Sequence, residues 1–251
     1  MNRLSRHAMG AAVVATLALA VAACGGKAAT SPTNPVALPE APPPASITPL
    51  ARTFPGEDGG DPVMMRRPLV TVPGNRDASK AINAALGVPE TAEELQPDGD
   101  VGDEFEVGYN ADGLLDISII HETMGAYPDT HTDHFLFDTS TGARLTGAAL
   151  FRADAVPKLV AAIDRQLQAE LVQAKRAGGD CVVEDGELFT GTFTAAHLDD
   201  VWVTKAGVAF QYPYDFPHAV QACEPAGTFV WSAKDLLPYL SDTSPLHRLV
   251  R

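Results

Sequence analysis

One stretch in the second half of the chain has the clearest helical pattern, and it limits the folds available to the rest. Asp154 and Pro157 stand where a helix would begin, and Gly178-Gly179 stand where it would end. Between them apolar residues recur every three or four positions, at Val156, Leu159, Val160, Ile163, Leu167, Leu171 and Ala174. We expect a long helix with one broad apolar stripe, suited to lying on a β-sheet.

Alternating patterns on both sides of this helix predict strands. One hairpin is expected over residues 105–119, around the turn residues Asn110 to Gly113, and a second over 201–212. Single strands are expected at 131–137 and 228–231. The sequence therefore predicts an α+β domain, with a mainly antiparallel sheet and the long helix packed on one face.

Two short additional helices are expected. Asp77 has the position of an N-cap for a helix that runs through Leu86 and ends at Gly87. Ser232 and Asp235 have the spacing of a helix start, and Pro238 limits the length of that helix.

The N-terminus predicts export. Arg3 and Arg6 precede an apolar run that ends in Val-Ala-Ala before Cys24, and small residues of this kind are typical of a cleavage site. We expect residues 1–23 to be a lipoprotein signal peptide and Cys24 to carry a diacylglyceryl group and an amide-linked chain such as palmitate. An ordinary secretory signal or a membrane anchor is the alternative, but the run is short for a bilayer span.

Composition divides the exported part into a tether and one domain. Residues 24–60 are rich in Ala and Pro and predict an extended tether, whereas residues 61–251 suit a single, monomeric α+β domain. Gly25 carries no signal for inner-membrane retention, so we expect an outer-membrane anchor facing the periplasm in a Gram-negative source.

The chain is strongly acidic. Removal of the signal peptide takes away two arginines and moves the formal charge from −14 to −16. This charge argues against nucleic-acid binding, which needs a basic surface, and favours solubility and cationic partners.

Three cysteines agree with export. With Cys24 lipidated, Cys181 and Cys223 form an even pair in an oxidising compartment, and a disulfide between them would contribute about 3 to 4 kcal/mol in the chain-entropy model. Two free thiols, one of them catalytic, are the alternative.

One segment concentrates metal-ligand residue types: His121, Glu122, Asp129, His131, Asp133 and His134. On a strand, His131 and Asp133 would share a face while His134 pointed to the other, and the spacing matches no closed zinc site. We therefore expect a solvated strand edge with no metal, and keep a zinc or copper site as the alternative. Gly125 excludes a helical metalloprotease motif at His121, because the second histidine is missing.

The sequence contains no recognisable catalytic or cofactor motif. The chain has no nucleophile elbow, phosphate-binding loop or dinucleotide fingerprint, although a glycosidase pair of carboxylates need not be close in sequence. Four aromatic residues alternate at Phe210, Tyr212, Tyr214 and Phe216. They fit core packing better than a sugar-binding platform, which stays the alternative.

Four stretches together resemble the extracytoplasmic domain family of the lysozyme-sensing anti-sigma factor RsiV, a domain also found beside peptidoglycan deacetylases. They are Gly125 to Pro128, then Phe137 to Gly142 leading to Leu150-Phe151, then the long helix, and finally Gly207 to Tyr214 running to Trp231 and Leu240. The resemblance covers about residues 110 to 240, and the helix at Ile82-Asn83 is similar to a companion segment.

The resemblance implies an α+β fold and a non-catalytic binding role at the cell envelope, for lysozyme, another cationic protein or peptidoglycan. Possible ligand-binding residues are Tyr127, His131, Asp133, His134, Tyr212 and Tyr214. Two alternatives stay open: an enzyme that modifies cell-wall glycan through carboxylates or a metal, and a domain that only assembles with other envelope proteins.

Overall fold

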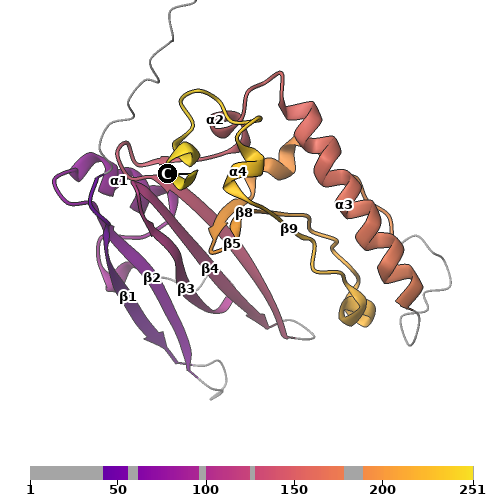
Figure 1. Ribbon diagram of the computed structural model, residues 1–251. Helices are drawn as coiled ribbons and strands as arrows, with labels where there is room; N and C mark the ends of the chain where they lie inside the picture. The colour runs from indigo at the N-terminus through magenta and orange to yellow at the C-terminus, as the bar shows by residue number, and fades with distance from the viewer. Residues whose placement is uncertain (1–41, 56–61, 96–99, 125–127, 178–188, 251) are drawn as a thin grey trace, which may run out of the picture. The chain divides into compact units, whose positions relative to one another are not determined.

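The computed structural model describes residues 42–55, 62–95, 100–124, 128–177 and 189–250, which belong to one compact unit, Glu40–Arg251 (Figure 1). The expected signal peptide and Cys24 lie outside these residues. None of the helices in the described part combines the length and apolar character that a bilayer span requires.

A six-stranded sheet forms the larger part of the fold. Its strand order follows the sequence from β1 to β6. The pairs are antiparallel except β2 and β3, which run parallel where Met65 lies opposite Asp103. The strands are β1 (Ser46–Phe54), β2 (Val63–Thr71), β3 (Asp100–Ala111), β4 (Leu114–Met124), β5 (Pro128–Asp138) and β6 (Ala143–Arg144).

The hairpin of β3 and β4 is present as expected, and its turn explains the register. Asp112 and Gly113 both have positive φ, 53° and 72°, as a two-residue turn with the twist of the flanking strands requires. Further along β3 the register shifts between Val107 and Tyr109, so the ladder has an irregularity at Gly108.

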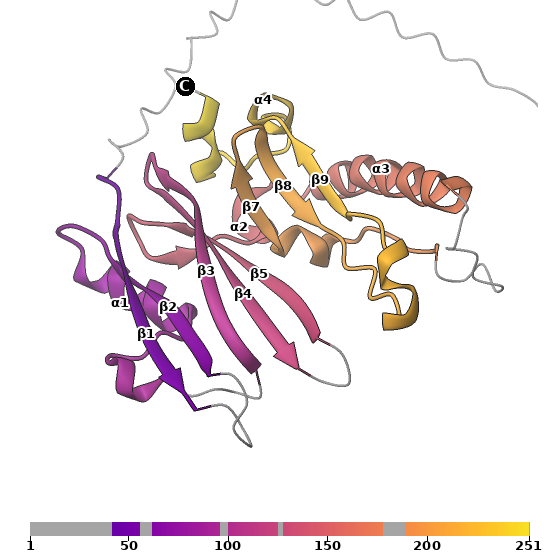
Figure 2. The ribbon, with the colours of Figure 1, turned by 90° about the horizontal axis from the view of Figure 1, so that it is seen from below.

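A second sheet corrects the expectation of one mainly antiparallel sheet. It contains β7 (Val201–Thr204), β8 (Gly207–Gln211) and β9 (Thr228–Trp231), all antiparallel. The long helix α3 (Val156–Ala177) lies beside β9 and the 3₁₀ turn η4 (Ala195–Asp199), away from β1 to β4 (Figures 1 and 2). The fold is therefore α+β with one mixed sheet and one small antiparallel sheet.

Helix α1 (Arg76–Ala85) covers one face of the six-stranded sheet. Its N-cap is Asn75 rather than Asp77, because the Asn75 side chain accepts the N–H of Ala78 at 3.0 Å. The Asn83 side chain bonds both the N–H and the C=O of Val70, at 2.8 and 2.9 Å, and so fixes the helix to β2. Buried residues on this face include Val70, Ile82, Leu115, Ile117, Ile119 and Phe137.

The opposite face carries the larger core. Leu114 and Leu136 belong to it, one position along each strand from residues that face α1. With them cluster buried residues of α3 and of the small sheet, including Leu159, Ile163, Leu167, Val203, Phe210 and Phe229. Burial of both sheet faces in this way explains the apolar residues at successive positions of β4, at Leu114-Leu115 and Ile119-Ile120.

Strand β1 lies within the range expected to be a tether. Residues 46–54 pair with β2 along their whole length, so the folded part begins before residue 61. The strand is at the edge of the sheet and mostly exposed, which is where Pro49 can be accommodated. The sequence prediction failed here because an exposed edge strand needs no alternating apolar pattern.

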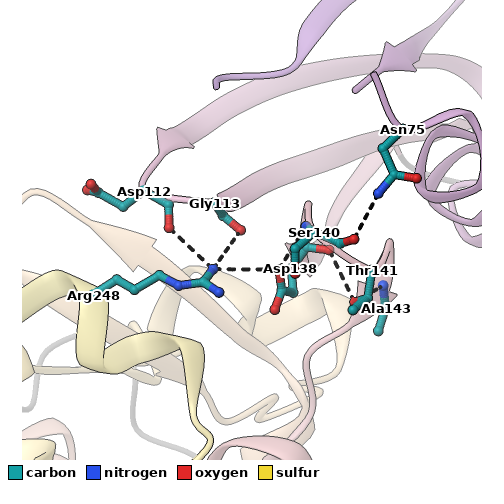
Figure 3. A network of polar contacts seen from close by, with 8 residues as sticks. All are labelled: Asn75, Asp112, Gly113, Asp138, Ser140, Thr141, Ala143 and Arg248. Carbon is teal, nitrogen blue, oxygen red and sulfur yellow. Dashed lines mark hydrogen bonds and ion pairs between the residues drawn. The ribbon is translucent and has the colours of Figure 1, made fainter. Parts of the chain in front are cut away.

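Arg248 ties the C-terminal end to the six-stranded sheet (Figure 3). It lies in η6 (Pro245–Val250) and is 8 % exposed, and its Nη1 donates to the carbonyl oxygens of Asp112 and Gly113 at 3.3 and 3.2 Å. The same atom lies 3.5 Å from Asp138 Oδ1. The remaining short elements are η2 (Ala92–Glu94), α2 (Gly147–Leu150), η5 (His218–Cys223) and α4 (Ala233–Leu236), the last N-capped by Ser232.

Candidate functional site

A row of polar side chains crosses four strands on the face of the sheet that carries α1. Asp103 lies opposite Met65 of β2 on one side and His121 of β4 on the other, and His121 lies opposite His131 of β5. Side chains two positions apart on a strand share a face. Arg67 is two positions from Met65 on β2, and Asp133 is two positions from His131 on β5, so both belong to the same row. The five side chains that compose it, Arg67, Asp103, His121, His131 and Asp133, are named here the histidine row.

The inner end of the histidine row is a buried ion pair. Arg67 Nη2 lies 2.5 Å from Asp103 Oδ2, and the Asp103 side chain is fully buried. The second carboxylate oxygen, Oδ1, lies 2.7 Å from His121 Nδ1. The other ring nitrogen of His121, Nε2, faces the outer end of the row, 3.4 Å from Asp133 Oδ2.

The outer end of the histidine row is open to solvent. His131 stacks on the His121 ring, with centroids 4.5 Å apart and planes 15° from parallel. The Oδ2 atom of Asp133 lies 3.4 Å from His121 Nε2. Ligand atoms of these three residues all lie within 4.8 Å of one another, with His121 buried and the other two exposed. They are therefore the residues among those described that could hold a metal ion.

His134 belongs to a different environment, as the strand pattern predicted. Its ring stacks on Trp202 of β7, with centroids 3.9 Å apart, and its Nδ1 lies 2.9 Å from the hydroxyl of Ser118. Burial lowers the pKa of His134 to about 4. It is therefore neutral at physiological pH and packs between the two sheets, on the opposite face from His131.

Asp116 is a buried carboxyl of β4 that the sequence pattern does not distinguish. It is 1 % exposed on β4, and its Oδ2 accepts the N–H of Val203 on β7 at 2.8 Å. Burial raises its pKa to about 7, against the lowering effect of that hydrogen bond. Asp116 and Ser118 are two positions apart on β4, and a pair of polar residues spaced in this way usually marks the exposed face of a strand. The local sequence therefore does not identify Asp116 as buried.

A further carboxyl with a raised pKa lies close to the histidine row. Burial first, and then the negative charge of Asp133, raise the pKa of Asp200 to about 6, while Arg144 acts in the opposite direction. The charge of Asp133 therefore acts on Asp200, although burial is the larger cause of the raised pKa.

The two tyrosines considered as a sugar platform are packed beside α3, apart from the histidine row. Tyr212 and Tyr214 meet edge to face, with centroids 4.9 Å apart and planes at 69°. The Tyr214 hydroxyl donates to Glu170 of α3 at 2.9 Å, and burial raises the pKa of that hydroxyl. Crossed rings that hold each other and the helix do not present one flat surface, so this arrangement fits core packing.

Several expected residues lie outside the described part of the chain. They include Tyr127, Cys24 and Cys181. Cys223, in η5, is disulfide-bonded. Its pairing with Cys181 stays a prediction.

Comparison with known proteins supports the fold only. No family model matches the sequence, and no curated protein does. Solved structures do match. The chain is similar in fold to DUF3298 proteins. A DUF3298 family member from Bacteroides fragilis aligns with 82 % of this chain and 96 % of its own, with a TM-score of 0.54 and 14 % identity. A DUF3298 family protein from Pseudomonas aeruginosa aligns over 82 % of this chain and 97 % of its own length, with a TM-score of 0.51 and 14 % identity.

Proposed function

We propose that this chain is a lipid-anchored, non-catalytic binding module of the cell envelope, and that its folded unit binds a cationic protein of the lysozyme kind. The observation that carries the proposal is the excess of acidic residues, 32 Asp and Glu against 18 Lys and Arg. The resemblance to the RsiV-type domain suggests the same class of partner, and an α+β fold is what that resemblance implies.

The charge acts mainly on association. A strongly negative protein attracts a strongly positive one over about one Debye length, which speeds their encounter, and it repels acidic partners. Exposed carboxylates on the six-stranded sheet, such as Glu106, Glu122 and Asp133, contribute to this field. Binding of this kind weakens as salt is added.

The lipid anchor determines the compartment in which the folded unit binds its partner. Two or more acyl chains on Cys24 would hold the protein stably on a membrane, because a single chain binds only marginally. The Pro-rich residues that follow would hold the folded unit away from the surface. In this proposal the anchor lies in the outer membrane, facing the periplasm, if the source has one.

Retention of lysozyme tests the proposal. The full chain is extracted from membranes in detergent and immobilised, and a basic lysozyme is passed over it at low salt and at roughly 0.5 M salt. We expect retention at low salt and release at high salt. The control is the same lysozyme with its lysines succinylated, which keeps its fold class and loses its positive charge, and which we expect to pass through.

Three results would contradict the proposal. Equal retention of native and succinylated lysozyme would show that positive charge does not determine binding. No retention at any salt concentration would show that lysozyme is not a partner. Release of soluble fragments from peptidoglycan incubated with the zinc-loaded chain would show turnover and favour the enzyme alternative.

A further inference from the structure

We propose that His121, His131 and Asp133 bind a single divalent transition-metal ion, zinc in the first instance, on the α1 face of the six-stranded sheet. Zinc binding is independent of the cationic partner, so either proposal can fail without the other.

The strand pairing brings three ligands toward one point. His131 and Asp133 are two positions apart on β5 and share a face, and His121 lies directly opposite His131 on β4. Directly opposed residues in an antiparallel pair have Cβ atoms about 5 Å apart, within the reach of imidazole and carboxylate groups. The three ligand atoms lie within 4.8 Å of one another before any ion is bound.

One distance already fits tetrahedral coordination. Zinc holds nitrogen and oxygen ligands at about 2.0 to 2.2 Å, which places two ligand atoms of a tetrahedral site about 3.4 Å apart. His121 Nε2 and Asp133 Oδ2 are 3.4 Å apart. His131 is exposed, so its ring can turn in its side-chain torsions to supply the third ligand without moving the backbone.

The residues behind His121 are arranged as outer-shell residues of a metal site usually are. A histidine ligand generally donates its other ring N–H to a carboxylate, which fixes the tautomer and the ring orientation. Asp103 has this position, 2.7 Å from His121 Nδ1, and Arg67 balances its charge in the interior. Burial of a carboxylate is costly unless it is paired, and Asp103 lies within ion-pair distance of both Arg67 and His121.

The ligand types select the metal class. Two imidazole nitrogens and one carboxylate suit zinc and its neighbours, whereas calcium and magnesium prefer oxygen ligands alone. Three protein ligands leave at least one position for water. The exposure of His131 and Asp133 places that position toward solvent.

Calorimetric titration with zinc chloride tests the site. The full chain, without an affinity tag and stripped with EDTA, is titrated in detergent, and we expect one ion per chain. Because His131 and Asp133 are exposed, the variants His131→Asn and Asp133→Asn should fold, and each should weaken zinc binding at least tenfold. The matched control is Glu122→Gln, next to His121 but on the opposite face of β4, which should bind zinc as the unmodified chain does.

A spectroscopic measurement separates coordination from a general charge effect. Cobalt substituted at the site should give the visible absorption of a four- or five-coordinate ion, and this absorption should disappear in His131→Asn. Absence of stoichiometric zinc binding in the unmodified chain would overturn the proposal. So would binding that His131→Asn and Asp133→Asn leave unchanged, or that Glu122→Gln weakens as much as they do.

Discussion

The carboxylate of Asp116, on β4, accepts a 2.8 Å hydrogen bond from the backbone N–H of Val203, on β7. This bond joins the two sheets, because β7 is at the edge of the small sheet and its outward N–H finds a partner in the large one. Gly108 makes room for the contact, since a Cβ at that position would lie 3.1 Å from Asp116 Oδ2.

The raised pKa of Asp116 predicts a pH dependence of stability. Its pKa is about 7 in the folded protein and 3.8 when unperturbed, so the folded state binds the extra proton between these values. The contribution of Asp116 to the free energy of unfolding is therefore full below about pH 4 and is lost as the pH rises to 7. The loss is about 1.4 kcal/mol for each pH unit at most.

Asp116→Asn isolates this effect, because the amide keeps an oxygen for Val203 and does not titrate. Urea unfolding of both proteins at pH 4.5 and pH 8 should show that the variant gains stability relative to the unmodified chain at the higher pH. Parallel pH profiles for the two proteins would contradict the assignment.

Two arginine–carboxylate pairs on neighbouring positions offer a comparison of buried and exposed ion pairs. The pairs Arg67–Asp103 and Arg66–Glu104 both have contacts of 2.5 Å, but Asp103 is fully buried and Glu104 is 39 % exposed. We expect Asp103→Asn to lower the free energy of unfolding by about 3 kcal/mol or more, because Arg67 loses its partner in the interior. Glu104→Gln should cost under about 1 kcal/mol. Equal losses in urea unfolding would contradict this account.

Arg248 is expected to hold the C-terminal end in place. Arg248→Met removes the donor to two carbonyl oxygens and the contact with Asp138, and should lower the free energy of unfolding by about 2 to 4 kcal/mol. Hydrogen exchange over residues 245–250 should become faster. Lys234→Met, at an exposed position on α4, is the control and should change neither quantity. Unchanged exchange in the Arg248 variant would show that the apolar residues of η6 suffice.

Local sequence patterns predicted much of the fold. Residue preferences agree with the structure at three places: the turn at Asp112 and Gly113, the β7–β8 hairpin and the strand at 228–231. The turn residues tolerate positive φ, and the strands are rich in β-branched and aromatic residues. The N-cap was misplaced by two residues, because Asn75 and Asp77 are both good caps and only the fold selects between them.

The candidate site could be predicted only in part. Alternation along one strand placed His131 and Asp133 on one face and His134 on the other, and this is confirmed. The partnership of His121 with His131 depends on the register of β4 and β5, and that of Asp103 with Arg67 depends on a parallel pairing between distant segments. No local pattern encodes such pairings, so the buried end of the histidine row was missed.

Processing at the N-terminus stays a prediction of the sequence. Mass spectrometry of the chain from membranes should find that residues 1–23 are absent and that Cys24 carries a diacylglyceryl group. Cys24→Ser should leave the chain in the soluble envelope fraction or unprocessed. Recovery of unmodified Met1 from the cytosol of the source cell would contradict export.

The proposed function is tested most directly by titration calorimetry of the detergent-extracted full chain with a basic lysozyme. The account predicts a saturable complex at low salt whose dissociation constant rises at least tenfold when salt is raised to roughly 0.5 M. A titration without heat at low salt, or a dissociation constant that does not change with salt, would contradict it.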